Sequence, residues 1–89
     1  MITLNNTKIN KIADLPQKTQ NDLNEYVRLI EIILPEIKSK VHKGINDKRF
    51  NIDGSIYILK QAKRNTKFVL EEIEAILSTI EEHKGNQNE

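Results

Sequence analysis

The stretch LKQAKRNTKFVLEEIEAILSTI, residues 59–80, carries the clearest periodic signal in the chain. Its apolar positions recur at alternating intervals of three and four residues, and Ile56, Leu70 and Leu77 broaden the same face. The repeat consists of Leu59, Ala62, Thr66, Val69, Ile73, Ile76 and Ile80. A period of 3.5 residues is typical of a helix in a bundle. The pattern therefore predicts an α-helix over residues 55–84.

A first helix is predicted upstream, over residues 14–43. Its repeat consists of Leu23, Tyr26, Ile30, Ile33 and Ile37, with Val27, Leu34 and Val41 at its side. Asp14 suits the N-cap position, Pro16 is tolerated in a first turn, and Gly44 is a typical stop. Pro35 clashes with the carbonyl four residues before it, so we expect a kink there, or a break with a second helix from residue 35.

The remaining segments are short. Residues 44–54 form the predicted connection, in which Asp53 or Ser55 can cap the next helix. Residues 1–13 predict a short extra helix or an arm across the bundle, with a strand stub at residues 2–5 as an alternative. Residues 85–89 predict a disordered tail. No linker divides the chain, so residues 1–89 are expected to form one helical domain.

Two long helices joined by a short connection predict an all-α antiparallel helical hairpin. Leu29 and Ile32 lie off the main stripe of the first helix, so one neighbouring helix cannot cover them. Either the N-terminal segment packs there, or two hairpins pair into a four-helix bundle. A chain of 89 residues buries only a marginal core by itself. We favour the homodimer for this reason.

Most catalytic and metal chemistry is excluded by the residue inventory. The chain has no cysteine, which rules out disulfides, thiolate metal sites and thiol nucleophiles. His42 and His83 each end a different predicted helix, so we expect them far apart and solvated. Residues 49–60 match a calcium loop only in part, because Arg49 and Lys60 replace its first and last carboxylates. No Glu-x-x-His motif occurs. We expect no enzyme, cofactor or metal.

The net charge of +1 conceals a strong asymmetry. Residues 38–67 hold nine basic and two acidic residues, hence a net charge of +7. The rest of the chain holds five basic and eleven acidic residues, hence −6. Folding the hairpin gathers the cations at the connected end. An anion would relieve their repulsion, and it could be an external partner or the acidic end of another copy in an antiparallel dimer.

A candidate partner-binding surface follows from these cations and two aromatic residues. It consists of Tyr57, Lys60, Lys63, Arg64, Lys67 and Phe68 on the second helix and Lys43, Lys48 and Arg49 around the connection. We expect a non-catalytic protein-interaction module, acting as a regulator, inhibitor or adaptor. The alternative is a nucleic-acid-binding regulator, since cations can contact phosphates while aromatic rings stack on bases.

The beginning of the chain lacks a basic segment followed by an apolar run, and no apolar stretch approaches about 18 residues. We therefore expect a cytoplasmic protein without a membrane span. In architecture the predicted hairpin is similar to small proteins that dimerise into four-helix bundles, including a plasmid copy-number regulator that binds paired RNA hairpins. In length and helix content it resembles the small cytoplasmic immunity proteins of bacteriocin producers. Neither group shares a sequence motif with this chain, so the resemblance implies a fold and a class only.

Overall fold

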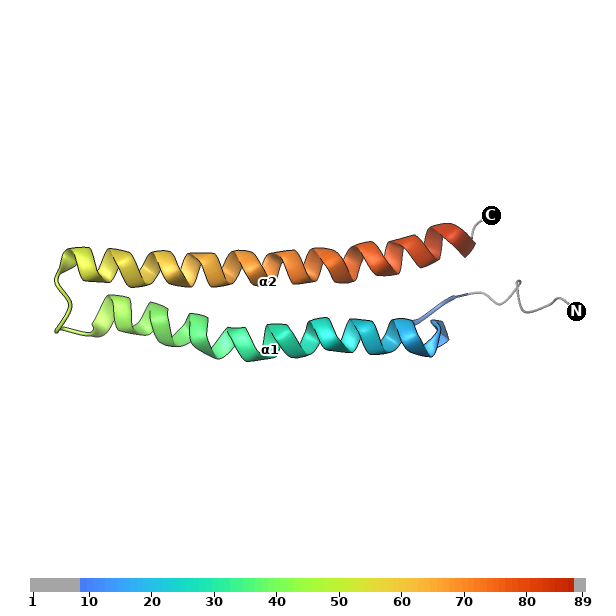
Figure 1. Cartoon of the computed structure of the whole chain (residues 1–89), viewed down its shortest axis with the longest axis horizontal. Helices are drawn as coiled ribbons and strands as arrows, with labels where there is room; N and C mark the ends of the chain where they lie inside the picture. Colours follow the sequence, from blue (N-terminus) through green and yellow to red (C-terminus); the bar gives the residue numbers. More distant parts are fainter. Residues whose placement is uncertain (1–8, 88–89) are drawn as a thin grey trace, which may run out of the picture.

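Two long antiparallel helices make up almost all of the structure, a computed structural model that describes residues 9–87 (Figure 1). A short 3-10 helix, η2 (Ile12–Asp14), precedes α1 (Gln17–Asn46) and α2 (Ile52–Gln87). The predicted all-α hairpin of two packed helices is confirmed. Its radius of gyration is 19.5 Å, against about 12 Å for a compact domain of this length. The hairpin is therefore a rod with little interior.

Contacts at the two ends of the hairpin define how the helices are aligned. Thr19 Oγ1 lies 3.3 Å from His83 Nε2 at one end. At the other end, a Cβ atom placed on Gly44 would lie 2.8 Å from Cγ of Leu59 and 3.0 Å from Cγ2 of Ile58. The residue numbers of these contacting pairs add up to 102 or 103, so the register is nearly constant along the hairpin. It follows that Ile30 lies opposite residue 72.

The inner face of α1 agrees with its sequence pattern. The predicted stripe of Leu23, Tyr26, Ile30, Ile33 and Ile37 is buried or half-buried throughout. The flanking residues Val27, Leu34 and Val41 are exposed. The 3.5-residue repeat therefore identified the side of α1 that contacts α2.

The inner face of α2 agrees with the predicted one only in part. The positions that face α1 are Ile58, Ala62, Asn65, Val69, Glu72, Ile76, Thr79 and His83, all buried or half-buried. Five residues of the predicted stripe are buried or half-buried, namely Leu59, Ala62, Val69, Ile76 and Ile80, whereas Thr66 and Ile73 are exposed. α2 carries a second, adjacent row with the same period, and α1 leaves most of that row uncovered. The predicted stripe is therefore confirmed at five of its seven positions and wrong at Thr66 and Ile73.

The core of the single hairpin is thin. Among the described residues, only Leu15, Leu23, Ala62 and Val69 are buried hydrophobic side chains, and none of them is fully buried. Fourteen of the large hydrophobic residues in this described part of the chain are exposed. The packing between α1 and α2 therefore leaves most of the apolar surface in contact with solvent.

Both predicted boundaries of α1 shift by three residues. α1 begins at Gln17, because the Asp14 carboxylate accepts hydrogen bonds from the backbone N–H groups of Asn10 (2.9 Å) and Lys11 (3.2 Å) and caps the preceding turn instead. α1 also continues past Gly44 to Asn46. No glycine between residues 9 and 87 has a positive φ, and Gly44 instead allows close contact with α2.

Pro35 lies inside α1 without ending it, so the alternative of a separate helix from residue 35 is wrong. Pro35 is exposed on the side of α1 away from α2. Proline removes the hydrogen bond to the Glu31 carbonyl, and water can supply the missing donor at such an exposed position. The helix therefore tolerates the proline where the backbone is solvated.

The connection is shorter than predicted and covers residues 47–51. Asn51 Oδ1 accepts a hydrogen bond from the Gly54 backbone N–H (2.7 Å), so Asn51 caps α2 in place of Asp53 or Ser55. Residues 85–87 are helical rather than a disordered tail. Residues 88–89 and the strand stub considered at residues 2–5 lie outside the described residues.

Candidate interaction surfaces

Four predicted site residues come together on α2. Lys60, Lys63, Arg64 and Lys67 line one shallow hollow of about 260 Å³. All four are exposed. The ion pairs found between residues 9 and 87 are Lys18–Asp22, Arg28–Glu25 and Arg49–Asp47. The four cations of the hollow thus have no carboxylate within 4 Å in the described part of the chain.

The two predicted aromatic residues lie beside this hollow. Tyr57, Arg64 and Phe68 are seven and four residues apart, so they share one side of α2. Tyr57 is 64% exposed and Phe68 is 37% exposed. Lys63 lies on a different side of α2 from Tyr57, Arg64 and Phe68, and Lys60 and Lys67 lie between the two sides. The predicted set is therefore continuous along α2, but it wraps around the helix rather than lying on one flat face.

The predicted site residues near the connection differ in whether they form an ion pair. The Arg49 guanidinium donates to the Asp47 carboxylate through Nη2 (2.7 Å) and Nε (3.0 Å). These hydrogen bonds from the Arg49 side chain hold the pKa of the Asp47 carboxyl well below its usual range and raise the pKa of Arg49. Lys43 and Lys48 are exposed and form no ion pair among the described residues. Lys43 and Lys48 are thus more available to a partner than Arg49.

A second surface, which we name the apolar face, covers one wide side of the hairpin. It consists of Val27, Leu34, Val41 and Ile45 from α1 and Ile56, Leu70, Ile73 and Leu77 from α2. Their exposed fractions lie between 40% and 67%. The sequence pattern pointed to most of these residues, but it placed those of α2 in the intramolecular contact. Only the register showed that they remain uncovered.

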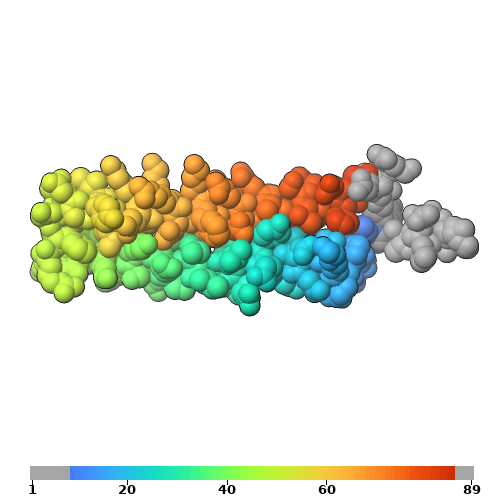
Figure 2. Space-filling view, viewed as in Figure 1, coloured from blue at the N-terminus to red at the C-terminus, as the bar shows by residue number. Residues whose placement is uncertain are grey.

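Helical geometry places the two halves of the apolar face on the same side. Val27, Leu34 and Val41 each follow an inner residue of α1 by one position, and Ile73 has the same relation to Glu72 in α2. In two antiparallel helices with heptad spacing, such flanking positions point to the same side of the pair. Figure 2 shows the two helices side by side along the length of the rod.

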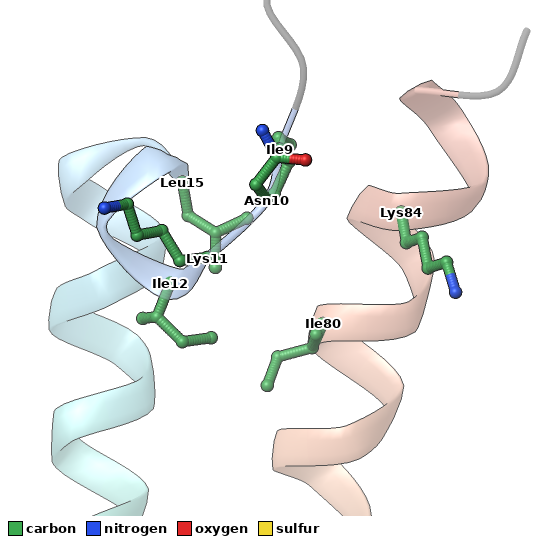
Figure 3. Close-up of a pocket in the computed structure, with 7 residues that line it drawn as sticks. All are labelled: Ile9, Asn10, Lys11, Ile12, Leu15, Ile80 and Lys84. Atoms are coloured by element: carbon green, nitrogen blue, oxygen red, sulfur yellow. The ribbon is translucent and has the colours of Figure 1, made fainter.

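A hollow of about 500 Å³ lies at the end of the rod away from the connection (Figure 3). Ile12 and Ile80 point toward one another across it, and Leu15 contributes to its lining. Ile80 belongs to the same row of α2 as Ile73, and both flank the inner face on the same side. The hollow therefore extends the apolar face at this end.

His83 is not the solvated group that we expected. It is half-buried, and its Nδ1 lies 3.0 Å from the Thr79 carbonyl oxygen, which can only accept a hydrogen bond. Nδ1 therefore carries a proton and donates to this carbonyl, and Nε2 forms a hydrogen bond with the Thr19 hydroxyl. His42, by contrast, is exposed. No group of three or more His, Cys, Asp or Glu side chains among residues 9–87 is arranged to hold a metal ion.

Comparisons with protein-family models, with curated proteins and with solved structures gave no match for this chain. Within the described residues, neither helix combines the length and apolarity needed to cross a membrane. The fold defines the class, an all-α two-helix hairpin.

Proposed function

We propose that this protein is a non-catalytic helical interaction module that pairs into a four-helix bundle and binds an acidic protein surface through its cationic end. The observation that carries the proposal is the hollow on α2, where four cations lie together without a carboxylate partner in the described residues. The thin core of the single hairpin supports the dimer, because small domains commonly need association to bury enough surface.

Electrostatics favours an anionic partner at this end. Lys60 and Arg64, like Lys63 and Lys67, are four residues apart, and each such like-charge pair costs a few tenths of a kcal/mol. An acidic surface would convert this cost into attraction. Tyr57 and Phe68 can add apolar contact at the same surface, since aromatic residues are enriched in protein interfaces.

An acidic protein surface suits the site better than nucleic acid. A net charge of +1 is low for a phosphate-binding domain, which usually has a basic excess. The nucleic-acid regulator is retained as the second candidate because Lys60, Lys63, Arg64 and Lys67 form a continuous cationic strip. The salt dependence of binding distinguishes the two candidates. The logarithm of the affinity for phosphates falls steeply and linearly with the logarithm of the salt concentration.

The test uses two defined probes, a polyglutamate peptide and an RNA oligonucleotide of equal charge. The triple substitution Lys60→Ala, Arg64→Ala and Lys67→Ala should weaken binding of the peptide by roughly tenfold to a hundredfold, at about 0.5–1 kcal/mol per contact. The control removes the same charge at the other end, through Lys11→Ala, Lys18→Ala and Lys84→Ala. The second candidate would be favoured if the protein bound the RNA more tightly than the peptide and only the triple substitution on α2 abolished that binding. Equal effects of both triples would overturn the cationic site.

A further inference from the structure

We infer that a second copy of this chain covers the apolar face, with α2 packed antiparallel against α2 of the partner and the two connections at opposite ends of the bundle. The inference rests on the proposed dimer and goes further by assigning its face and its orientation. It follows from the composition of an exposed row on α2, from the area of the face and from a charged row at its edge.

The row of α2 beside the contact with α1 is largely apolar and exposed. It consists of Ile56, Lys63, Thr66, Leu70, Ile73 and Leu77, four of which are apolar. Leu59 and Ile80, at its two ends, are half-buried. Burial of apolar surface is the main driving force for association. A partner that covers this row therefore gains from contacts that α1 does not make.

The area of the apolar face fits a second copy. Its eight residues, at their exposed fractions, present on the order of 700 Å², compared with about 300–600 Å² for the largest apolar patch of a typical monomer. Two such faces in contact would bury roughly 1,400 Å², which lies within the range of about 1,200–2,000 Å² for stable interfaces. The face also runs lengthwise along both helices, from the connection to Val27 and Leu77, as the facing side of another hairpin would.

A row of charges at the outer edge of α2 makes this face self-complementary. Lys60, Lys67, Glu74 and Glu81 recur every seven residues directly beside the uncovered row, and their sign changes at the midpoint. When Leu70 faces Ile73 of the partner subunit, antiparallel α2 helices bring Lys67 near the partner's Glu74 and Lys60 near the partner's Glu81. These pairs engage two of the four cations of the hollow, and Arg64, on the side of α2 that carries Tyr57 and Phe68, stays available to the proposed acidic surface. Opposite charges at such flanking positions set orientation in helical bundles.

The other symmetric way to join the same faces is disfavoured by charge. A two-fold axis along the rod would place both connections at one end and α1 over the partner's α2. It would gather the cations of both copies, where residues 38–67 alone carry +7 per chain. Like charges across an interface are unfavourable. The change from lysine to glutamate within the charged row produces opposite-charge pairs only when the two connections lie at opposite ends of the bundle.

The face is tested with a matched pair of substitutions on α1. Leu34 lies on the apolar face and is 49% exposed, while Ile32 lies on the opposite wide side and is 57% exposed. Leu34→Asn should weaken the dimer at least tenfold by sedimentation equilibrium, because the two-fold axis makes each substitution count twice. Ile32→Asn should change the dissociation constant less than threefold. Equal effects would overturn the assignment of the face.

The relative orientation of the two copies is tested by charge reversal and by the distance between two spin labels. Lys67→Glu and Glu74→Lys should each weaken the dimer roughly threefold to tenfold, and the double variant should recover wild-type affinity, because opposite charges face each other again. Since the chain has no cysteine, Lys48→Cys accepts a single spin label. Labels on opposite connections should lie about 60 Å apart by helix rise.

The outcomes separate this inference from the proposal on which it rests. A protein that stays monomeric at high micromolar concentration, in both low and moderate salt, would overturn the dimer and the inference together. A dimer with labels closer than about 30 Å, or one that the double charge reversal does not restore, would overturn the inference and leave the dimeric module standing. Recovery together with a long distance supports both.

Discussion

The Thr19 hydroxyl lies 3.3 Å from Nε2 of His83 and joins the beginning of α1 to the end of α2. The same imidazole is held from its other side by the Thr79 carbonyl oxygen, 3.0 Å from Nδ1. The ring is therefore oriented between the helices, and its position defines the register at the end of the rod away from the connection. This register decides which side of α2 is left uncovered.

His83→Ala should lower the free energy of unfolding by about 0.5–1.5 kcal/mol, because it removes a half-buried side-chain hydrogen bond between the helices. Urea unfolding followed by circular dichroism measures the change. A double-mutant cycle with Thr19→Ala isolates the coupling between the two side chains. His42→Ala is the control, since His42 is exposed, and it should change the unfolding free energy by less than about 0.5 kcal/mol. A cycle without coupling would contradict the assigned contact.

Gly44→Ala and Gly85→Ala should change the free energy of unfolding in opposite directions. Alanine favours a helix over glycine by up to about 1 kcal/mol, so Gly85→Ala, with nothing within 4 Å of the new Cβ, should stabilise the protein. A Cβ on Gly44 would lie 2.8 Å from Leu59 Cγ, and overpacking typically costs about 1–3 kcal/mol. Thermal unfolding compares the two variants. Equal stabilisation by both would show that the helices do not approach closely at Gly44.

Asn51→Ala should destabilise the protein by about 1 kcal/mol, because it removes the oxygen that accepts the Gly54 N–H at the start of α2. Ser55→Ala is the matched comparison, since Ser55 was one of the two caps expected from sequence but lies inside the helix. We expect that change to stay within about 0.5 kcal/mol. The midpoint of urea unfolding distinguishes the two. A larger loss from Ser55→Ala would place the start of α2 later than residue 52.

Glu72→Leu should stabilise the protein by about 0.5–1.5 kcal/mol, since Glu72 is half-buried opposite Ile30 and a leucine there would add apolar contact. Glu71→Leu removes the same charge at an exposed neighbouring position and should have little effect. Denaturant unfolding at constant protein concentration compares them. Destabilisation by Glu72→Leu would mean that its carboxylate is needed at the contact between the helices.

Pro35→Ala should raise the free energy of unfolding by about 1–3 kcal/mol, because it restores a backbone donor inside α1 and removes a residue that disfavours helix. Pro35 is exposed, so the substitution leaves the contact with α2 unchanged. Thermal unfolding measures the gain. A loss of stability would indicate that the geometry Pro35 imposes on α1 is required for packing.

The sequence was informative wherever the signal is local. The 3.5-residue repeat identified both helices and the inner face of α1, because apolar periodicity depends on residues only a few positions apart. The cluster of Lys60, Lys63, Arg64 and Lys67 was likewise predictable, since residues three and four apart on a helix lie together. The cap at Asn51 and the helical role of Gly44 were missed, because Asp53, Ser55 and a glycine stop gave equally good local signals.

By itself, the sequence determined that the chain forms two helices, which side of α1 lies inside, and that the cations gather at the connected end. The tertiary structure alone decided which of the two apolar rows of α2 faces α1. That choice depends on the alignment of the two helices, which is set by contacts between residues far apart in the chain, such as Thr19 with His83 and Gly44 with Leu59. Since both rows have the same period, periodicity cannot choose between them, and packing at the ends of the rod does.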